Sequence, residues 1–184
     1  MDPRRIIGEI SPQDADVTQL WDGLLRAFFF CLGISELLTL QYRDIKFTKD
    51  SGQWVMSILI RESKTDQEKA GVTRMIRVSG KLLRHVLAMR AFIDTLPKSA
   101  NPDTCLFPPS FRRKLVLATQ WVAGENGIPM SVVNTHSLRA GGATALFPAG
   151  VDWVAIQRWG RWESFVFHQY IWHDHSGFME LGWK

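Results

Sequence analysis

Cysteine and long apolar runs are both scarce in this chain of 184 residues. The only cysteines are Cys31 and Cys105, too few for a disulfide-stapled secreted scaffold. Both lie in apolar surroundings and neither belongs to a C-x-x-C pair, so we expect two reduced core residues. The longest apolar run, residues 27–32, is far shorter than the ~20 residues of a membrane span. The N-terminus carries Arg4 and Arg5 without a following apolar region, so no signal peptide is expected. We therefore expect a soluble, intracellular protein.

The composition shows no low-complexity segment and no internal repeat. Hydrophobic residues make up 46% of the chain and charged residues 22%, which is typical of a globular domain and excludes a disordered or collagen-like chain. The formal net charge is +4 and the sequence pI is about 9.3. This positive excess is compatible with a polyanionic partner such as nucleic acid but does not establish one.

Hydrophobic periodicity predicts a mostly α protein with a small antiparallel β-sheet (α+β). A buried helix begins near Asp14 or Asp16, and Ser35 is expected to cap a short helix at 36–42. Strands are predicted at 54–60 and 72–78, joined by a charged loop. Further helices are predicted from 80 to 97, at 110–125, at 137–146, at 152–158 and at 163–172. We expect a polar leader (1–13), one domain (14–175) and a short tail (176–184).

One segment, 135–144, combines groups that bind phosphate. His136 and Arg139 are three residues apart at the start of a predicted helix, which places them on one face. Backbone N–H groups at a helix N-terminus add positive potential there. Taken alone, this pair is better explained by a structural histidine beside a surface arginine, so a phosphate site needs support from the rest of the chain.

The order of several short motifs provides that support. Phe29 to Leu40 is followed by Asp44, then by Ser63-Lys64-Thr65-Asp66, by the H-x-x-R pair His136/Arg139, by Ala149 to Asp152, by Gly160-Arg161-Trp162, and by Tyr170. Tyr170 is one of only two tyrosines, and read alone it is an ordinary core residue. In this order the motifs resemble the catalytic domain of the tyrosine recombinase (phage integrase) family. The resemblance covers residues 16–172, and Gly160 to Ser164 is most similar to versions in eukaryotic mobile elements.

The resemblance implies DNA strand cleavage and rejoining through a 3′-phosphotyrosine, without metal or cofactor. Tyr170 is then the nucleophile, Arg139 clamps the scissile phosphate, and His136 binds the phosphate or assists proton transfer. Lys64 is the general acid, and Arg161 or Trp162 donates a further hydrogen bond. The implied partners are double-stranded DNA and further copies of the chain on that DNA, with no membrane and no small-molecule substrate. A eukaryotic host would place the protein in the nucleus.

The sequence departs from the family pattern at Gly33, where the family has an arginine. Losing such a preplaced donor costs about 3 kcal/mol, or about 100-fold in rate. Arg26 and Arg43 are the nearest arginines that could replace it. The alternative function is therefore a catalytically inactive DNA-binding module derived from a mobile-element recombinase.

Three further features have simpler explanations. The late tryptophans could form an interaction surface, but we expect them to fill the core: Trp153, Trp159, Trp162, Trp172 and Trp183. The histidines His168, His173 and His175 lack the ligand pattern of a zinc site. Several basic residues could follow a phosphate track or simply lie on solvated helix faces: Arg84, Arg90, Arg112, Arg113 and Lys114.

Overall fold

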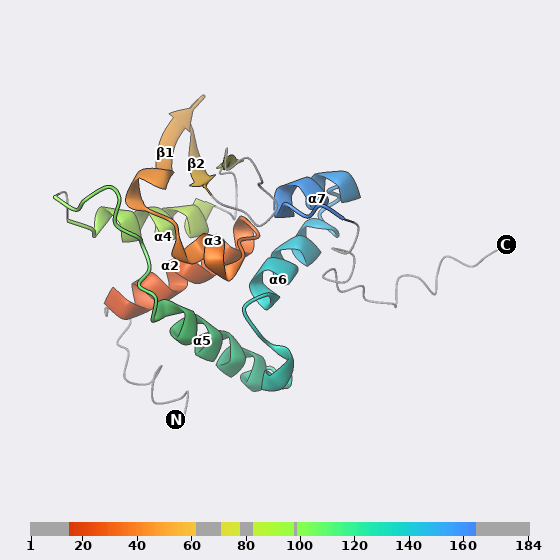
Figure 1. The fold of residues 1–184 in the computed structure, drawn as a ribbon. Coiled ribbons are helices and arrows are strands. Elements are labelled where there is room, and N and C mark those ends of the chain that lie inside the picture. Colours follow the sequence, from red (N-terminus) through yellow and green to blue (C-terminus); the bar gives the residue numbers. More distant parts are fainter. Residues whose placement is uncertain (1–14, 62–70, 78–82, 98, 165–184) are drawn as a thin grey trace.

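The computed structural model describes residues 15–61, 71–77, 83–97 and 99–164, which form helices packed around α2 and a small sheet (Figure 1). The helices are α2 (Ala15–Phe29), α3 (Ile34–Leu38), α4 (Leu83–Asp94), α5 (Phe111–Glu125), α6 (Ser137–Leu146) and α7 (Trp153–Gly160), with 3₁₀ turns η1 (Tyr42–Asp44) and η3 (Met130–Val132). The strands are β1 (Ile45–Asp50), β2 (Gln53–Ile60) and β3 (Val72–Arg77). The predicted α+β class is confirmed.

Helix α2 is central because its apolar residues recur every three or four positions and face several partners. It contacts α3, α4, α5 and α6. Leu25 and Ala27 are buried in the main core, together with Met89 of α4 and Leu115 of α5. The same helix also buries an ion pair, in which Arg26 Nε donates to Asp22 Oδ2 at 2.6 Å. Residues before Ala15 lie outside the described residues, so the predicted helix start near Asp14 or Asp16 stays a prediction.

The sheet is antiparallel with the order β1-β2-β3 (Figure 1). Its two predicted strands are confirmed as β2 and β3, paired from Val55↔Arg77 to Ile60↔Val72. Strand β1 was missed because its apolar alternation is limited to Ile45 and Phe47, too short a pattern to indicate a strand. A tight turn joins β1 to β2, and both of its central residues, Ser51 and Gly52, have positive φ, as hairpin turns require.

Helix α6 packs directly on the end of α2 because its residues there are small. Gly142 lies so close to α2 that an added Cβ would stand 2.1 Å from the backbone oxygen of Phe28. Ala143 is fully buried and joins Cys31 and Ile156 in a second, smaller core between α6 and α7. The small residues of α6 therefore fix the position of the helix that carries His136 and Arg139.

Several sequence expectations need correction or fall outside the described residues. Helix α3 begins at Ile34 and has Gly33, not Ser35, as its N-cap. Cys31 is buried as expected, but Cys105 is exposed, so its placement in the core was wrong. The predicted helix 163–172, the leader 1–13 and the tail 176–184 lie wholly or mostly outside the described residues. No helix in the described part of the chain is both long and apolar enough to cross a membrane.

The expectation that the late tryptophans fill the core is confirmed for those that the structure describes. Trp153, Trp159 and Trp162 are partly buried and pack against the second core. Trp159 also stacks on Phe30 and donates from Nε1 to the Phe29 oxygen at 3.1 Å. These contacts attach α7 to the end of α2. Trp172 and Trp183 lie outside the described residues, as do His168, His173 and His175.

Candidate active site

The guanidinium of Arg139 lies where α6, α7 and the α2–α3 corner meet. Its Nη2 donates to the backbone oxygen of Gly160, and its Cζ lies 4.9 Å from the centre of the Trp162 ring. Its Nη1 is 3.8 Å from Glu36 Oε2, and 18% of the side chain is exposed. Arg139 is therefore held in place by an acceptor, a carboxylate and an aromatic face while it stays partly open to solvent.

Trp162 lies against Gly160, and that close approach requires glycine. An added Cβ at Gly160 would stand 1.6 Å from Trp162 Cζ3. The ring can therefore lie flat under Arg139 only because residue 160 has no side chain. The close approach of Trp162 thus explains why the first residue of the Gly160-Arg161-Trp162 motif is glycine.

Glu36 is the acidic centre of this corner and is 4% exposed. Its Oε2 accepts from the backbone N–H of Gly33 at 2.6 Å, which stabilises the first turn of α3. Position 33 adjoins both charged groups. A Cβ there would lie 3.2 Å from Arg139 Nη1 and 3.4 Å from Glu36 Oε2. Any side chain at position 33 would enter the same charged cluster.

Arg161 is buried in this corner, in contrast to the partly open Arg139. Its side chain is 5% exposed, and its Nη2 is 2.8 Å from Glu36 Oε2. Sequence reasoning left open whether residue 161 or 162 faces a phosphate. In the structure Arg161 points into the α2–α3 corner, and Trp162 lies beside Arg139.

The β2–β3 hairpin is attached to this cluster through Arg74. Arg74 Nη2 donates to the backbone oxygen of Arg158 at 2.5 Å, and its Cζ is 5.7 Å from the centre of the Trp159 ring. Burial lowers the pKa of Arg74, and the nearby positive charge of Arg161 lowers it further. At the other end, Arg61 Nε donates to Asp44 Oδ1 at 2.8 Å. Arg61 and Arg74, which lie on either side of Lys64 in the sequence, are thus both bonded to the rest of the fold.

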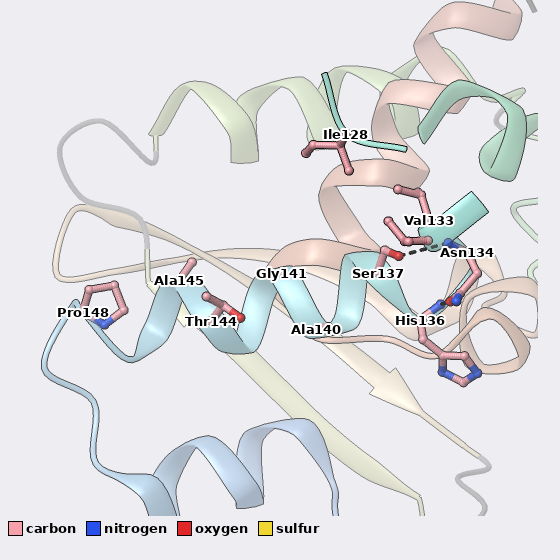
Figure 2. A pocket seen from close by; sticks show the side chains of 11 residues that line it. Ile128, Val133, Asn134, His136, Ser137, Ala140, Gly141, Thr144, Ala145 and Pro148 are labelled. Carbon is pink, nitrogen blue, oxygen red and sulfur yellow. Dashed lines mark hydrogen bonds between the residues drawn. The ribbon is translucent and has the colours of Figure 1, made fainter. Parts of the chain in front are cut away.

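His136 is exposed and occupies the N-cap position of α6. Its backbone N–H donates to Asn134 Oδ1 at 2.8 Å, which shapes the turn before the helix. It also lines a mostly apolar cavity of about 610 Å³ along α6. Figure 2 shows His136 at one end of this row of side chains and Pro148 at the other. His136 and Arg139 thus share the first turn of α6, as predicted.

Neither arginine considered as a replacement at position 33 lies in the site. Arg26 is fully buried in the main core, where its Nη2 donates to the Met89 oxygen at 3.1 Å. Arg43 pairs with Asp103 at 2.5 Å, and both side chains are more than half exposed. Of the six predicted site residues, the structure describes His136, Arg139, Arg161 and Trp162, whereas Lys64 and Tyr170 lie outside the described residues.

Sequence reasoning missed two residues of the site. Glu36 was quoted only as part of the first motif, and its burial beside two arginines was not predicted. Arg74 was read only as a strand residue. A signal for Glu36 existed, because a carboxylate three residues after a helix N-cap typically bonds back to the cap N–H. No sequence signal indicated that Arg74 would reach α7, since that contact joins residues 84 positions apart.

The basic residues show no single track in the described structure. Arg90 lies with its Cζ 4.2 Å from the Trp54 ring centre and pairs with Asp94. Arg112 and Arg113 are exposed on the first turn of α5. Within the described residues, no cluster of three or more histidine, cysteine or acidic side chains could hold a metal ion.

Comparisons with known proteins support the fold. No protein-family model matches the sequence, and no curated protein matches it either. Among solved structures, the chain is similar to the XerH site-specific recombinase bound to its difH substrate before cleavage (TM-score 0.61, 18% identity, 97% of this chain and 49% of that chain). It is also similar to the XerH post-cleavage complex with palindromic difH (TM-score 0.66, 19% identity, 95% and 47% covered).

A third similar structure is the Tn1549 transposon integrase with circular-intermediate DNA (TM-score 0.53, 16% identity, 95% of this chain and 64% of that chain). The chain thus spans about half the length of the XerH chains and 64% of that integrase chain. These similarities, which extend over 95–97% of this chain, lead to one conclusion. The chain has the fold of a tyrosine-recombinase catalytic domain.

Proposed function

We propose that the chain cleaves and rejoins DNA strands through a covalent 3′-phosphotyrosine at Tyr170. The observation that carries this proposal is the placement of Arg139. Its guanidinium is fixed by Gly160, Glu36 and Trp162, yet 18% of the side chain remains exposed at the first turn of α6. The similar XerH and Tn1549 proteins are recombinase and integrase structures with DNA, which supports double-stranded DNA as the substrate.

In the proposed reaction the Tyr170 oxygen attacks the phosphorus and the bond from phosphorus to O5′ breaks. The phosphoryl oxygens gain negative charge in the transition state, and a preorganised arginine stabilises that charge. Arg139 fits this role because its planar guanidinium can donate to two oxygens at once. A phenol with a pKa near 10 is a weak nucleophile at neutral pH, so its proton must be removed as it attacks.

The remaining roles belong to residues around Arg139. His136, at the N-cap of the same helix, binds the phosphate or assists proton transfer. Lys64 donates a proton to the leaving O5′ from the loop between Arg61 and Arg74. The Trp162 ring lies beside Arg139, and its indole N–H, a hydrogen-bond donor only, donates to the phosphate in this proposal. We expect the reaction to need neither metal nor ATP, since the phosphoryl bond energy is kept in the phosphotyrosine.

The second candidate function is a DNA-binding module without cleavage. Two observations favour it: Gly33 offers no side chain to a phosphate, and the buried guanidinium of Arg161 is bonded to protein acceptors. One clamp arginine then remains instead of two, which costs about 100-fold or more in rate. Self-association of several copies on one DNA is compatible with both functions.

The test is incubation with a nicked suicide DNA duplex, followed by a denaturing gel. The proposal predicts a covalent protein–DNA adduct that is absent from the Tyr170→Phe variant. Binding to the same duplex is measured in parallel at several salt concentrations, because phosphate contacts make affinity fall as salt rises. Salt-dependent binding without any adduct would establish the DNA-binding module instead.

A further inference from the structure

Every N–H of the Arg161 guanidinium has a protein acceptor. A guanidinium carries five N–H donors. Nε donates to Glu36 Oε1 at 3.1 Å and Nη2 donates to Glu36 Oε2 at 2.8 Å. Nη1 donates to the oxygens of Phe30 and Trp159, and Nη2 also donates to the Cys31 oxygen at 2.8 Å. These five bonds join the end of α2, the start of α3 and the end of α7.

The backbone of Arg161 adopts an unusual conformation where its side chain makes these five hydrogen bonds. It has φ 58° and ψ 46° at the C-cap of α7, a left-handed conformation that a residue with a Cβ rarely adopts. Non-glycine residues persist there where their surroundings over-determine the geometry. The five hydrogen bonds of the side chain provide that constraint. Glycine, the residue preferred at such a helix end, would leave the corner without its cation.

Arg161 and Arg139 share one buried carboxylate. Arg161 donates to both oxygens of Glu36, at 3.1 and 2.8 Å, and the Gly33 N–H also donates to Oε2. Arg139 Nη1 lies 3.8 Å from Oε2. Because Arg161 bonds to both oxygens of Glu36, the carboxylate orients Arg139 through a longer contact of 3.8 Å. Without Arg161, we expect the Arg139 guanidinium to shift towards the buried Glu36 carboxylate, because Arg139 is the other arginine paired with Glu36 in the described part of the chain.

We propose that Arg161 is a positioning residue for Arg139, and that Gly33 and Arg161 form a matched pair. This inference rests on the proposed role of Arg139 in binding phosphate. Gly33 places no side chain against Glu36 and Arg139, where an added Cβ would already lie 3.2 Å from Arg139 Nη1 and 3.4 Å from Glu36 Oε2. Arg161 supplies the cation for that carboxylate from α7. An arginine introduced at position 33 competes for a carboxylate that is already occupied.

The first test is a thermal unfolding cycle without DNA, using Gly33→Arg, Arg161→Gln and the double variant. Arg161→Gln leaves a buried carboxylate without its short ion pair, so we expect Tm to fall by about 10 °C. The double variant should unfold at a higher Tm than Arg161→Gln alone, because the new arginine can then pair with Glu36. A double variant whose Tm falls by the sum of the two single changes overturns the matched pair.

The charge-matched control is Arg43→Gln, which removes the exposed ion pair with Asp103 and is expected to shift Tm by no more than a few degrees. If Gly33→Arg alone prevents folding, Glu36→Gln provides a second cycle with Arg161→Gln. If Arg161 pairs with Glu36, each single variant should lower Tm strongly, and the double variant should lower it little further. Additive losses contradict it.

The second test separates positioning from general support of the fold. Affinity for a short duplex is measured for Arg161→Gln, Arg139→Gln and their double variant, at a temperature where each is folded. A positioning role predicts that Arg161→Gln weakens binding several-fold in the unmodified background and has no further effect once Arg139 is replaced. An equal loss in both backgrounds overturns it.

The outcomes distinguish this inference from the proposed function. If the Tm and DNA-affinity cycles are both non-additive but no Tyr170-dependent adduct forms, the matched pair of Gly33 and Arg161 is supported and strand cleavage is rejected. If the changes in both cycles are additive and a Tyr170-dependent adduct forms, the matched pair is rejected and strand cleavage is supported.

Discussion

Gly142 of α6 lies against the backbone oxygen of Phe28 at the end of α2, with room for hydrogen but not for a methyl group. An added Cβ would stand 2.1 Å from that oxygen and 3.1 Å from Cys31 Sγ. The backbone cannot move aside as the end of a side chain can, so Gly142→Ala must separate the two helices. We expect a loss of about 3 kcal/mol or more in the free energy of unfolding, measured by urea denaturation.

Gly124→Ala is the matched control for that variant. Gly124 is also helical, in α5, but an added Cβ would make only ordinary contacts of 3.5 Å or more with Met130. Alanine is a better helix former than glycine by about 1 kcal/mol, so this variant should be as stable as the unmodified chain or more stable. Equal destabilisation by both substitutions would show that α6 does not pack on α2 as described.

For the buried pair of Asp22 and Arg26, replacing one partner should lower stability much more than replacing both. Both side chains are essentially inaccessible, at 1% and 0% exposed. Arg26→Met leaves an uncompensated buried carboxylate and should cost about 3–5 kcal/mol, whereas Asp22→Leu/Arg26→Met should recover most of that loss. Chemical denaturation of the three proteins measures this difference, and a double variant as unstable as Arg26→Met would contradict the pairing.

The free energy of unfolding should also depend on pH through the buried carboxyl group of Asp22. Burial raises the pKa of Asp22 above its ordinary value of 3.8, although Arg26 opposes the shift. The folded state therefore holds this proton at a pH where the unfolded state has released it. As pH rises from 3.8 through the folded pKa, Asp22 makes a falling contribution to stability. In Asp22→Asn this contribution is absent, and the difference in unfolding free energy between the two proteins should change with pH in that window.

Thiol chemistry tests the placement of the two cysteines. Cys31 is buried and Cys105 is exposed. Burial raises the pKa of Cys31 to about 12, despite the neighbouring Arg161 and Arg139, and the thiolate is the reactive form. In the native protein at pH 8 we expect an aromatic disulfide reagent to modify one thiol quickly, and Cys105→Ser to remove that reaction. Two equally fast thiols would contradict the buried position of Cys31.

Much of the fold could be predicted from the sequence because the helices are strongly periodic. The limits 137–146 of α6 agree with the prediction, and Asp152 caps α7 by accepting from Val154 and Ala155. Strand β1 was missed because its apolar alternation is limited to Ile45 and Phe47, and its second half, Thr48-Lys49-Asp50, is polar and exposed. Local patterns identify elements that bury one face, and they fail for elements that are mostly exposed.

The site was predictable only where its residues are close in sequence. His136 and Arg139 were found from a spacing of three on one helix. The contact between Arg161 and Glu36 spans 125 positions, and the burial of Arg161 depends on a left-handed backbone that no local pattern indicates. The contact of Arg74 with α7 is equally remote. Long-range pairing of charged side chains therefore had to come from the structure.

The most direct measurement of the proposed function identifies the residue that becomes attached to DNA. The protein is trapped on a nicked suicide duplex, digested with nuclease and protease, and the nucleotide-bearing peptide is sequenced by mass spectrometry. The account predicts one modified peptide, with the 3′-phosphate on Tyr170, and its loss in Tyr170→Phe and strong reduction in Arg139→Gln. Attachment at another residue, or DNA binding with no attached peptide at any enzyme concentration, would contradict it.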